Sequence, residues 1–147
     1  MNFEVRSSSP EETIALGERL GGFLRGREIF LISGELGSGK TVLAKGIASA
    51  LDIPPGDVVS PSFVLMNAYQ GKFKLFHFDL YRLGGGMAAD CGIDEYIDEG
   101  VILIEWAQHL APHRSVFDRV VKVWMDNRSD RERHIRIETS LDYIRLP

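Results

Sequence analysis

The sequence predicts an α/β fold, in which helices pack on a mostly parallel β-sheet that is extended by antiparallel strands. An apolar run at 29–33 leads through a glycine-rich loop into a helix-like run at 40–51. Four consecutive aliphatic residues at 101–104 are typical of a strand buried on both faces. Two alternating segments, 64–79 and 120–138, contain turn residues and predict hairpins. At 147 residues and 44% hydrophobic composition, the chain is long enough for one domain with its own core.

The N-terminal segment combines a strand signal with a helix signal. Residues 2–6 alternate weakly and predict a short edge strand. Ser9 can cap a helix that extends to about Leu24, and Glu12 completes a capping box. The pair Gly21-Gly22 is expected to weaken the last turn of this helix. Its apolar stripe consists of Leu16, Leu20, Phe23 and Leu24.

The stretch GELGSGKT at 34–41 fits the phosphate-binding pattern G-x-x-x-x-G-K-[ST]. Its glycines let backbone N–H groups approach a phosphate, and the following helix offers its positive end. Lys40 supplies a charge for the β- and γ-phosphates, and the Thr41 hydroxyl can ligate Mg²⁺. An incidental glycine-rich turn is disfavoured, because strand, loop and helix follow in the required order. We therefore expect a P-loop NTPase-like, three-layer fold that binds a nucleoside triphosphate. The predicted nucleotide-binding residues of this stretch are Glu35, Leu36, Gly37, Ser38, Gly39, Lys40, Thr41 and Val42.

A phosphate loop also needs a carboxylate at the end of a neighbouring strand to hold Mg²⁺ and orient a nucleophile. Glu105 ends the most apolar strand of the chain, as a Walker B acid does, and Asp79 ends a less apolar one. The alternative, an acid that only caps the next turn, is weaker for Glu105 than for Asp79. The candidate catalytic residues are therefore Glu105, Asp79 and Lys40, and the candidate metal ligands are Thr41, Glu105 and Asp79. Which acid positions water stays open.

Several further positions allow more than one interpretation. Ser60-Pro61-Ser62 is either a switch segment whose hydroxyls meet Mg²⁺ or phosphate, or an ordinary turn. Trp106 belongs either to the core or beneath the nucleotide. His77, in an apolar strand, is interpreted as a packed or hydrogen-bonded core histidine, and Arg82 as a surface arginine. The arginines of the last hairpin alternate with acids and predict a solvated tip; they are Arg128, Arg131 and Arg133.

Composition narrows the classes of function. A net charge of -4 gives no reason to expect tight, sequence-independent binding to nucleic acid. Cys91 is the only cysteine, so an intrachain disulfide is impossible and a reducing compartment fits. There is neither a signal-peptide core nor an apolar run of membrane-spanning length, so we expect a soluble, cytoplasmic protein without a membrane partner.

Four motifs together resemble the TsaE (YjeE) family: GELGSGKT at 34–41, SPSF at 60–63, HFDLYRL at 77–83 and IEW at 104–106. These are bacterial ATPases needed for the threonylcarbamoyl modification of adenosine 37 in tRNA. The resemblance covers nearly the whole chain. It implies ATP and Mg²⁺ as cofactors and the TsaB–TsaD heterodimer as partner, with tRNA met only through that complex. ATP hydrolysis would support turnover of the complex and not the transfer itself.

The resemblance also bears on individual positions. It strengthens the prediction for Asp79, which matches the acid of HFDLYR. Ser62 stands where the family more often has Thr, and Val42 where many members have a second Thr. The region Gly84–Asp90 is unusually rich in glycine, which leaves its part in docking open. The residues that match the family pattern are Lys40, Thr41, Ser60, Ser62, Asp79 and Glu105.

Two alternatives to the ATPase use the same loop. A small-molecule kinase is disfavoured, because the chain shows no lid-like insertion with several arginines. A non-catalytic, nucleotide-dependent binding module is disfavoured by Glu105, since a placed acid suits Mg²⁺ and water. The switch segment and the glycine-rich loop lack constraints of their own, so we expect slow hydrolysis without a partner.

Overall fold

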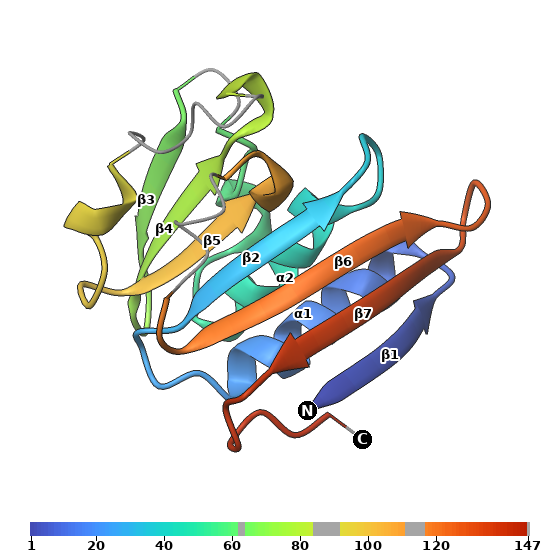
Figure 1. The fold of residues 1–147 in the computed structure, drawn as a ribbon, viewed down its shortest axis with the longest axis horizontal. Helices are drawn as coiled ribbons and strands as arrows, with labels where there is room; N and C mark the ends of the chain where they lie inside the picture. Colours follow the sequence, from blue (N-terminus) through green and yellow to red (C-terminus); the bar gives the residue numbers. More distant parts are fainter. Residues whose placement is uncertain (62–63, 84–91, 111–116, 147) are drawn as a thin grey trace.

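The computed structural model describes residues 1–61, 64–83, 92–110 and 117–146. Within these residues seven strands form one sheet in the order β1-β7-β6-β2-β5-β4-β3 (Figure 1). Strands β6, β2, β5 and β4 are parallel, whereas β3 and β7 pair antiparallel to their neighbours. The predicted α/β class, with a mostly parallel sheet and added antiparallel strands, is confirmed. The elements are β1 (Asn2–Ser7), α1 (Pro10–Gly22), β2 (Ile29–Gly34), α2 (Lys40–Ala50), η1 (Pro55–Asp57), β3 (Met66–Gln70), β4 (Lys74–Asp79), η2 (Tyr81–Leu83), η4 (Ile93–Glu95), β5 (Val101–Glu105), η5 (Ala107–His109), β6 (Val120–Asn127) and β7 (Arg133–Thr139).

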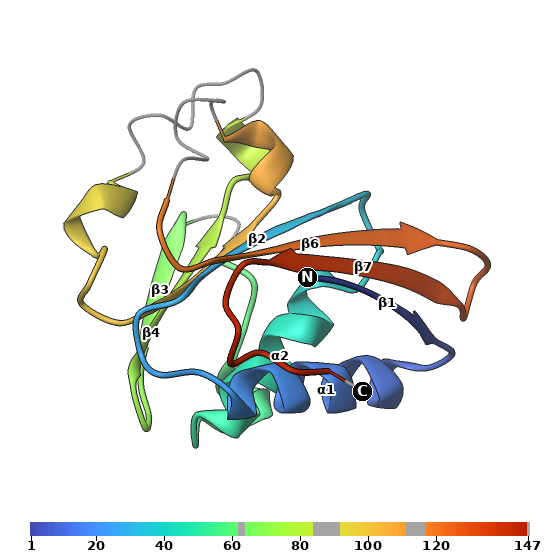
Figure 2. The ribbon, with the colours of Figure 1, turned by 60° about the horizontal axis from the view of Figure 1, so that its bottom comes forward.

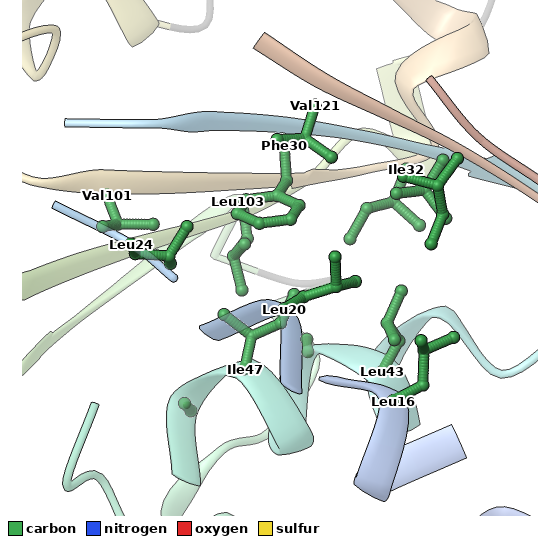
Figure 3. Packing of buried hydrophobic residues seen from close by; sticks show 14 of the residues in the cluster. Leu16, Leu20, Leu24, Phe30, Ile32, Leu43, Ile47, Val101, Leu103 and Val121 are labelled. Carbon is green, nitrogen blue, oxygen red and sulfur yellow. The ribbon is translucent and has the colours of Figure 1, made fainter. Parts of the chain in front are cut away.

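The two α-helices lie side by side on one face of the sheet, and the short turns η4 and η5 lie on the other side (Figures 1 and 2). Strand β5 has apolar side chains on both faces, and both faces are covered. Its side chains alternate between two buried clusters: Val101 and Leu103 face the helices, and Ile102 and Ile104 face the turns. The predicted burial of this strand on both faces is confirmed. In Figure 3, leucines of α1 and α2 point toward side chains of β2 and β5; the labelled residues include Leu16, Leu20, Leu43, Phe30, Ile32 and Leu103.

Helix α1 begins as predicted and ends slightly earlier. The Ser9 hydroxyl accepts a hydrogen bond from the Glu12 N–H at 3.1 Å. The Glu12 carboxylate reaches back to the N–H of Ser8, not that of Ser9, at 2.6 Å. The helix ends at Gly22, short of the predicted Leu24.

Glycines let α1 and α2 approach each other closely. A Cβ atom on Gly17 would lie 2.5 Å from the Leu43 carbonyl oxygen, and one on Gly46 would lie 2.2 Å from the Ile14 carbonyl oxygen. Gly21 belongs to the same contact, since its Cβ would lie 2.8 Å from the Ile47 carbonyl oxygen. The sequence interpretation treated Gly21 only as a weak point of the last turn, because a single helix pattern does not show which neighbour it will meet.

The remaining sequence predictions divide into three groups. The edge strand β1 and the hairpins β3–β4 and β6–β7 are confirmed by their pairing. The predicted helix over 93–99 is wrong in extent, since only the 3₁₀ turn η4 forms before Asp98 adopts a positive φ of 73°. The predictions for Ser62, Gly84–Asp90 and Cys91 lie outside the described residues.

Candidate functional site

The carboxyl ends of three parallel strands meet at one edge of the sheet (Figure 1), and most of the predicted site residues that the structure describes line a cavity there. Strand β2 leads into the phosphate loop, β5 ends at Glu105 and β4 ends at Asp79. Strand register places Glu105 directly beside Ile32 on β2 and beside Asp79 on β4. Crevices at this edge of an open α/β sheet are where such folds bind ligands.

The phosphate loop depends on glycine at defined positions. Gly37 and Gly39 have φ angles of 78° and 97°, which side chains with a Cβ rarely adopt. Gly39 is also the N-cap of α2, so the backbone turns directly into the helix. Gly34 packs against β6, where a Cβ would lie 2.7 Å from the Met125 carbonyl oxygen. The loop is thus held between β2, α2 and β6.

Lys40 lies inside the loop. Its Nζ donates to the carbonyl oxygens of Gly34 and Glu35, both at 2.8 Å, and to Ser38 Oγ at 3.2 Å. The ammonium also lies 4.2 Å from the centre of the Trp106 ring. Burial lowers the pKa of Lys40, and the negative charges of Glu105 and Asp79 oppose that shift. A phosphate entering the loop would therefore meet an ammonium group that the loop already holds.

The two candidate acids are both buried, and they have different partners. Glu105 accepts hydrogen bonds from Thr41 Oγ1, at 2.9 and 3.0 Å to its two oxygens, and lies 2.5 Å from His77 Nε2. Asp79 accepts from Ser60 Oγ at 2.5 Å and from the Tyr81 N–H at 2.8 Å. Glu105 is therefore tied to the first turn of α2, and Asp79 is tied to the candidate switch segment.

These residues surround an open cavity of about 660 Å³. It is lined by Leu36, Gly37, Gly39, Lys40, Thr41, Val42, Ser60, Asp79, Tyr81, Arg82, Glu105, Trp106 and Arg133. A second groove of about 300 Å³ shares Gly39, Val42 and Arg133 with it and continues toward the start of α1. The structure thus brings together most of the predicted site, while Glu35 enters it only through its backbone carbonyl.

Trp106 lies in the cavity wall. This residue has a left-handed backbone, with φ 58°, and its half-buried ring both lines the cavity and packs against the core cluster on the side of the turns. The ring stacks on His109 at a centroid distance of 5.2 Å and makes a tilted contact with Tyr81 at 4.8 Å. Gln108, in the same turn, donates to the Gly34 carbonyl oxygen at 3.0 Å. The turn after β5 therefore braces the phosphate loop. Non-glycine residues with left-handed backbones often occur at functional sites.

Two arginines interpreted as surface residues line the cavity. Arg82 is exposed, as predicted, but its side chain lies at the cavity edge. Arg133 was predicted to lie at a solvated tip, and this is wrong: its Nη2 donates to the Gly37 carbonyl oxygen at 3.1 Å. Local charge alternation could not reveal this contact. It follows from the pairing of Gly34 with Met125, which brings the β6–β7 turn beside the phosphate loop.

The residues fit a magnesium ion better than a metal held by protein ligands alone. No group of three or more His, Cys, Asp or Glu side chains suited to a metal occurs in the part of the chain that is described. The Thr41 and Ser60 hydroxyls and the carboxylates of Glu105 and Asp79 lie at this edge. Mg²⁺ commonly takes one or two carboxylates and completes its shell with phosphate oxygens and water.

No helix among the described residues has the length and apolarity to cross a membrane.

Comparison with known proteins gives a consistent result. The family model described as "Threonylcarbamoyl adenosine biosynthesis protein TsaE" matches residues 7–135. A "tRNA threonylcarbamoyladenosine biosynthesis protein TsaE" from Aquifex aeolicus is 40% identical over 111 residues, covering 74% of this chain and 80% of its own. A protein of that name from Bacillus subtilis is 36% identical over 132 residues, covering 88% and 81%. A crystal structure of Bacillus subtilis YdiB matches with a TM-score of 0.74 at 29% identity, covering 93% of this chain and 84% of that one. The chain therefore belongs to the TsaE family.

Proposed function

We propose that this protein binds ATP with Mg²⁺ at the carboxyl edge of its sheet and hydrolyses it slowly. The observation that carries the proposal is the contact between the Thr41 hydroxyl and both oxygens of Glu105, at 2.9 and 3.0 Å, directly after a complete phosphate loop. A hydroxyl at the start of α2 and an acid at the end of β5 are the two protein groups that hold Mg²⁺ in P-loop enzymes.

Each residue has a defined task in this proposal. The N–H groups of the loop hold the β-phosphate, and Lys40 exchanges its bonds to the loop carbonyls for bonds to phosphate oxygens. Thr41 and Glu105 hold Mg²⁺, which neutralises charge on the phosphates when bound. Asp79 and Ser60, already hydrogen-bonded to each other, face the γ-phosphate end of the cavity and orient water. The groove beyond Arg133 receives the nucleoside.

The pathway follows from the relatives, whose names place them in tRNA threonylcarbamoyladenosine biosynthesis. We propose the same pathway for this chain. ATP hydrolysis would support turnover of the TsaB–TsaD heterodimer, and tRNA would be reached only through that complex. Leu36 and Tyr81 line the open cavity and are 71% and 44% exposed, which suits a site that a partner completes.

The test is Mg²⁺-dependent ATP hydrolysis by the protein alone and with the cognate TsaB–TsaD heterodimer, with Lys40→Ala as control. We expect slow hydrolysis alone, strong stimulation by the heterodimer, and loss of both in the control. Hydrolysis that is absent or indifferent to the heterodimer would refute the proposal. A phosphorylated product with an added small-molecule acceptor would favour a kinase. A Glu105→Ala variant that binds ATP and keeps cellular function would favour a non-catalytic binding module.

A further inference from the structure

His77 is a buried histidine that the proposed function leaves without a task. It lies in β4, its side chain is fully buried, and its Nε2 lies 2.5 Å from Glu105 Oε2. Glu105 is itself only 2% exposed. Burial of polar groups is costly unless they are hydrogen-bonded, so this contact is a substantial interaction between two adjacent strands.

The hydrogen-bond partners of the two ring nitrogens determine which of them carries the proton. Nδ1 of His77 has no hydrogen-bond partner among the described residues. A proton on Nδ1 alone would leave a buried N–H unsatisfied and would set the Nε2 lone pair against a carboxylate oxygen. A proton on Nε2 lets the ring donate to Glu105 Oε2 and leaves only one acceptor unpaired, which costs less. His77 is therefore a hydrogen-bond donor to Glu105.

The sheet fixes the direction of this hydrogen bond. His77 pairs with Leu103, and Asp79 pairs with Glu105, in the parallel register of β4 and β5. Residues two apart on a strand share a face, so His77 lies diagonally next to Glu105 on the side of α2. Thr41 contacts the same carboxylate from α2. The Glu105 carboxylate is thus held from two elements, and Oε1 is contacted by Thr41 and not by His77.

We propose that His77 is a positioning residue for the magnesium site, because its Nε2–H bond to Oε2 keeps the Glu105 carboxylate turned toward Thr41 and the cavity. This inference rests on the proposed function, since it requires a magnesium-bound nucleotide at this edge. Partners that orient a ligating carboxylate contribute about ten- to hundredfold to metal affinity. His77 does not line the cavity, so nucleotide binding without metal should not depend on it.

The experiment measures ADP affinity by calorimetry in excess Mg²⁺ and in EDTA, and takes the ratio as the magnesium gain. The variants are His77→Gln and His77→Asn. The glutamine amide nitrogen is separated from Cα by the same number of bonds as Nε2, whereas the asparagine amide nitrogen corresponds to Nδ1 and falls short of Glu105. We expect His77→Asn to bind ADP in EDTA as tightly as the parent does. Its magnesium gain, however, should be about ten- to hundredfold smaller than that of the parent. His77→Gln should keep most of the gain.

The control is Leu75→Val, which alters packing on the same strand and the same face without touching a hydrogen bond. It should leave the magnesium gain unchanged. A full gain in His77→Asn, an equal loss of affinity with and without Mg²⁺, or a lost gain in Leu75→Val would each overturn the positioning role. Loss of the gain in His77→Gln would also overturn it, even if His77→Asn did not fold. A parent protein that binds no ADP in either condition would instead refute the proposed function itself.

Discussion

Lys40 shows at the scale of a single residue how the phosphate loop holds a buried positive charge. Its ammonium is held by two loop carbonyls and a serine hydroxyl, and the Trp106 ring covers it. These bonds replace the hydrogen bonds to water that an ammonium group loses when it is buried. A triphosphate offers the same group charged acceptors, which form stronger hydrogen bonds than neutral carbonyls. In the proposed function, nucleotide binding would therefore exchange the partners of a charge that is already buried.

We expect Lys40→Ala to weaken ATP binding by about ten- to hundredfold, because a hydrogen bond to a charged group contributes about 1.5–3 kcal/mol. Calorimetry in the presence of Mg²⁺ measures the loss. Lys45→Ala is the matched control, since it removes the same charge from α2 but does not line the cavity. An unchanged affinity in Lys40→Ala would place the nucleotide elsewhere.

Glu28 is a second buried carboxylate, far from the site, just before β2. It accepts hydrogen bonds from the backbone N–H groups of Arg25, Gly26 and Arg27 at 2.8–3.1 Å, and from the Tyr143 hydroxyl at 2.5 Å. Burial alone would raise the pKa of Glu28, but the Tyr143 hydroxyl and the backbone donors together lower it below 4.5. The ionised form is therefore part of the native structure.

The sign of the pH dependence follows. The native state binds fewer protons at Glu28 than the unfolded chain, so its contribution to stability is present above about pH 4.5 and is lost as the pH falls through the native-state pKa. We expect Glu28→Gln to lower the free energy of unfolding at pH 7 by about 1–3 kcal/mol. The free energy of unfolding of the variant should also depend less on pH in the acid range. Urea titrations at pH 7 and across pH 3–5 test both effects. An acid limb identical to the parent's would contradict the assignment.

At the scale of elements, the helix pair positions the site. Helix α2 carries Lys40 and Thr41 at its start and packs closely against α1 on the same face of the sheet. Glycines at the crossing remove the side chains that would separate the two helices. This contact therefore links the stability of the fold to the helix that carries the proposed magnesium ligand Thr41.

We expect Gly46→Ala to lower the free energy of unfolding by about 1–3 kcal/mol through overpacking, although alanine is the better helix former by about 1 kcal/mol. Denaturant unfolding measures the change. Gly22→Ala is the matched control, because a Cβ at that position meets nothing within 4 Å, and it should be neutral or slightly stabilising. Equal effects of the two substitutions would show that helix propensity, and not the crossing, determines the cost.

The β6–β7 hairpin is the second element that reaches the site. Arg133 donates from Nη1 to the Ser129 carbonyl oxygen of its own turn at 3.0 Å, and from Nη2 to Gly37 of the phosphate loop. We expect Arg133→Ala to weaken ATP binding by about two- to tenfold, as one hydrogen bond contributes about 0.5–1.5 kcal/mol. Arg128→Ala, in the same turn but outside both cavities, should leave the affinity unchanged. If both variants weaken binding equally, general charge and not the loop contact is responsible.

At the scale of the whole molecule, the sequence predicted the elements better than their contacts. The phosphate loop, the strand ending at Glu105 and the hairpins follow from local patterns of glycine, apolar and turn residues. The structure confirms the buried strand that ends at Glu105 and the two hairpins. The extent of the 93–99 helix was overestimated, because its acidic pattern says nothing about the competing turn at Asp98. The assignments of Lys40, Thr41, Asp79 and Glu105 to ATP and Mg²⁺ stay predictions, although the fold brings these side chains to one cavity.

Contacts between distant segments could not be predicted in the same way. His77 was expected in the core, but its bond to Glu105 depends on the register of β4 with β5. Arg133 reaches the loop only because β6 lies parallel to β2. Gly46 is a poor helix former within α2, and only the contact with α1 explains why a glycine stands there. In each case the missing information is the pairing of elements, which no local sequence pattern contains.

The same long-range contacts predict how nucleotide affects the stability of the whole chain. The cavity draws on the phosphate loop, β4, β5 and the β6–β7 hairpin, which are far apart in sequence, so unfolding any of them destroys it. A ligand at 100 times its dissociation constant adds about 2.7 kcal/mol to the free energy of unfolding. For a chain of this size, that corresponds to a rise in Tm of about 5–10 °C. Differential scanning fluorimetry with ATP and Mg²⁺ should show this rise, EDTA should reduce it, and Lys40→Ala should reduce it to about half or less. A rise of equal size in Lys40→Ala would mean that ATP stabilises the fold from a different place, and that the edge described here is not where it binds.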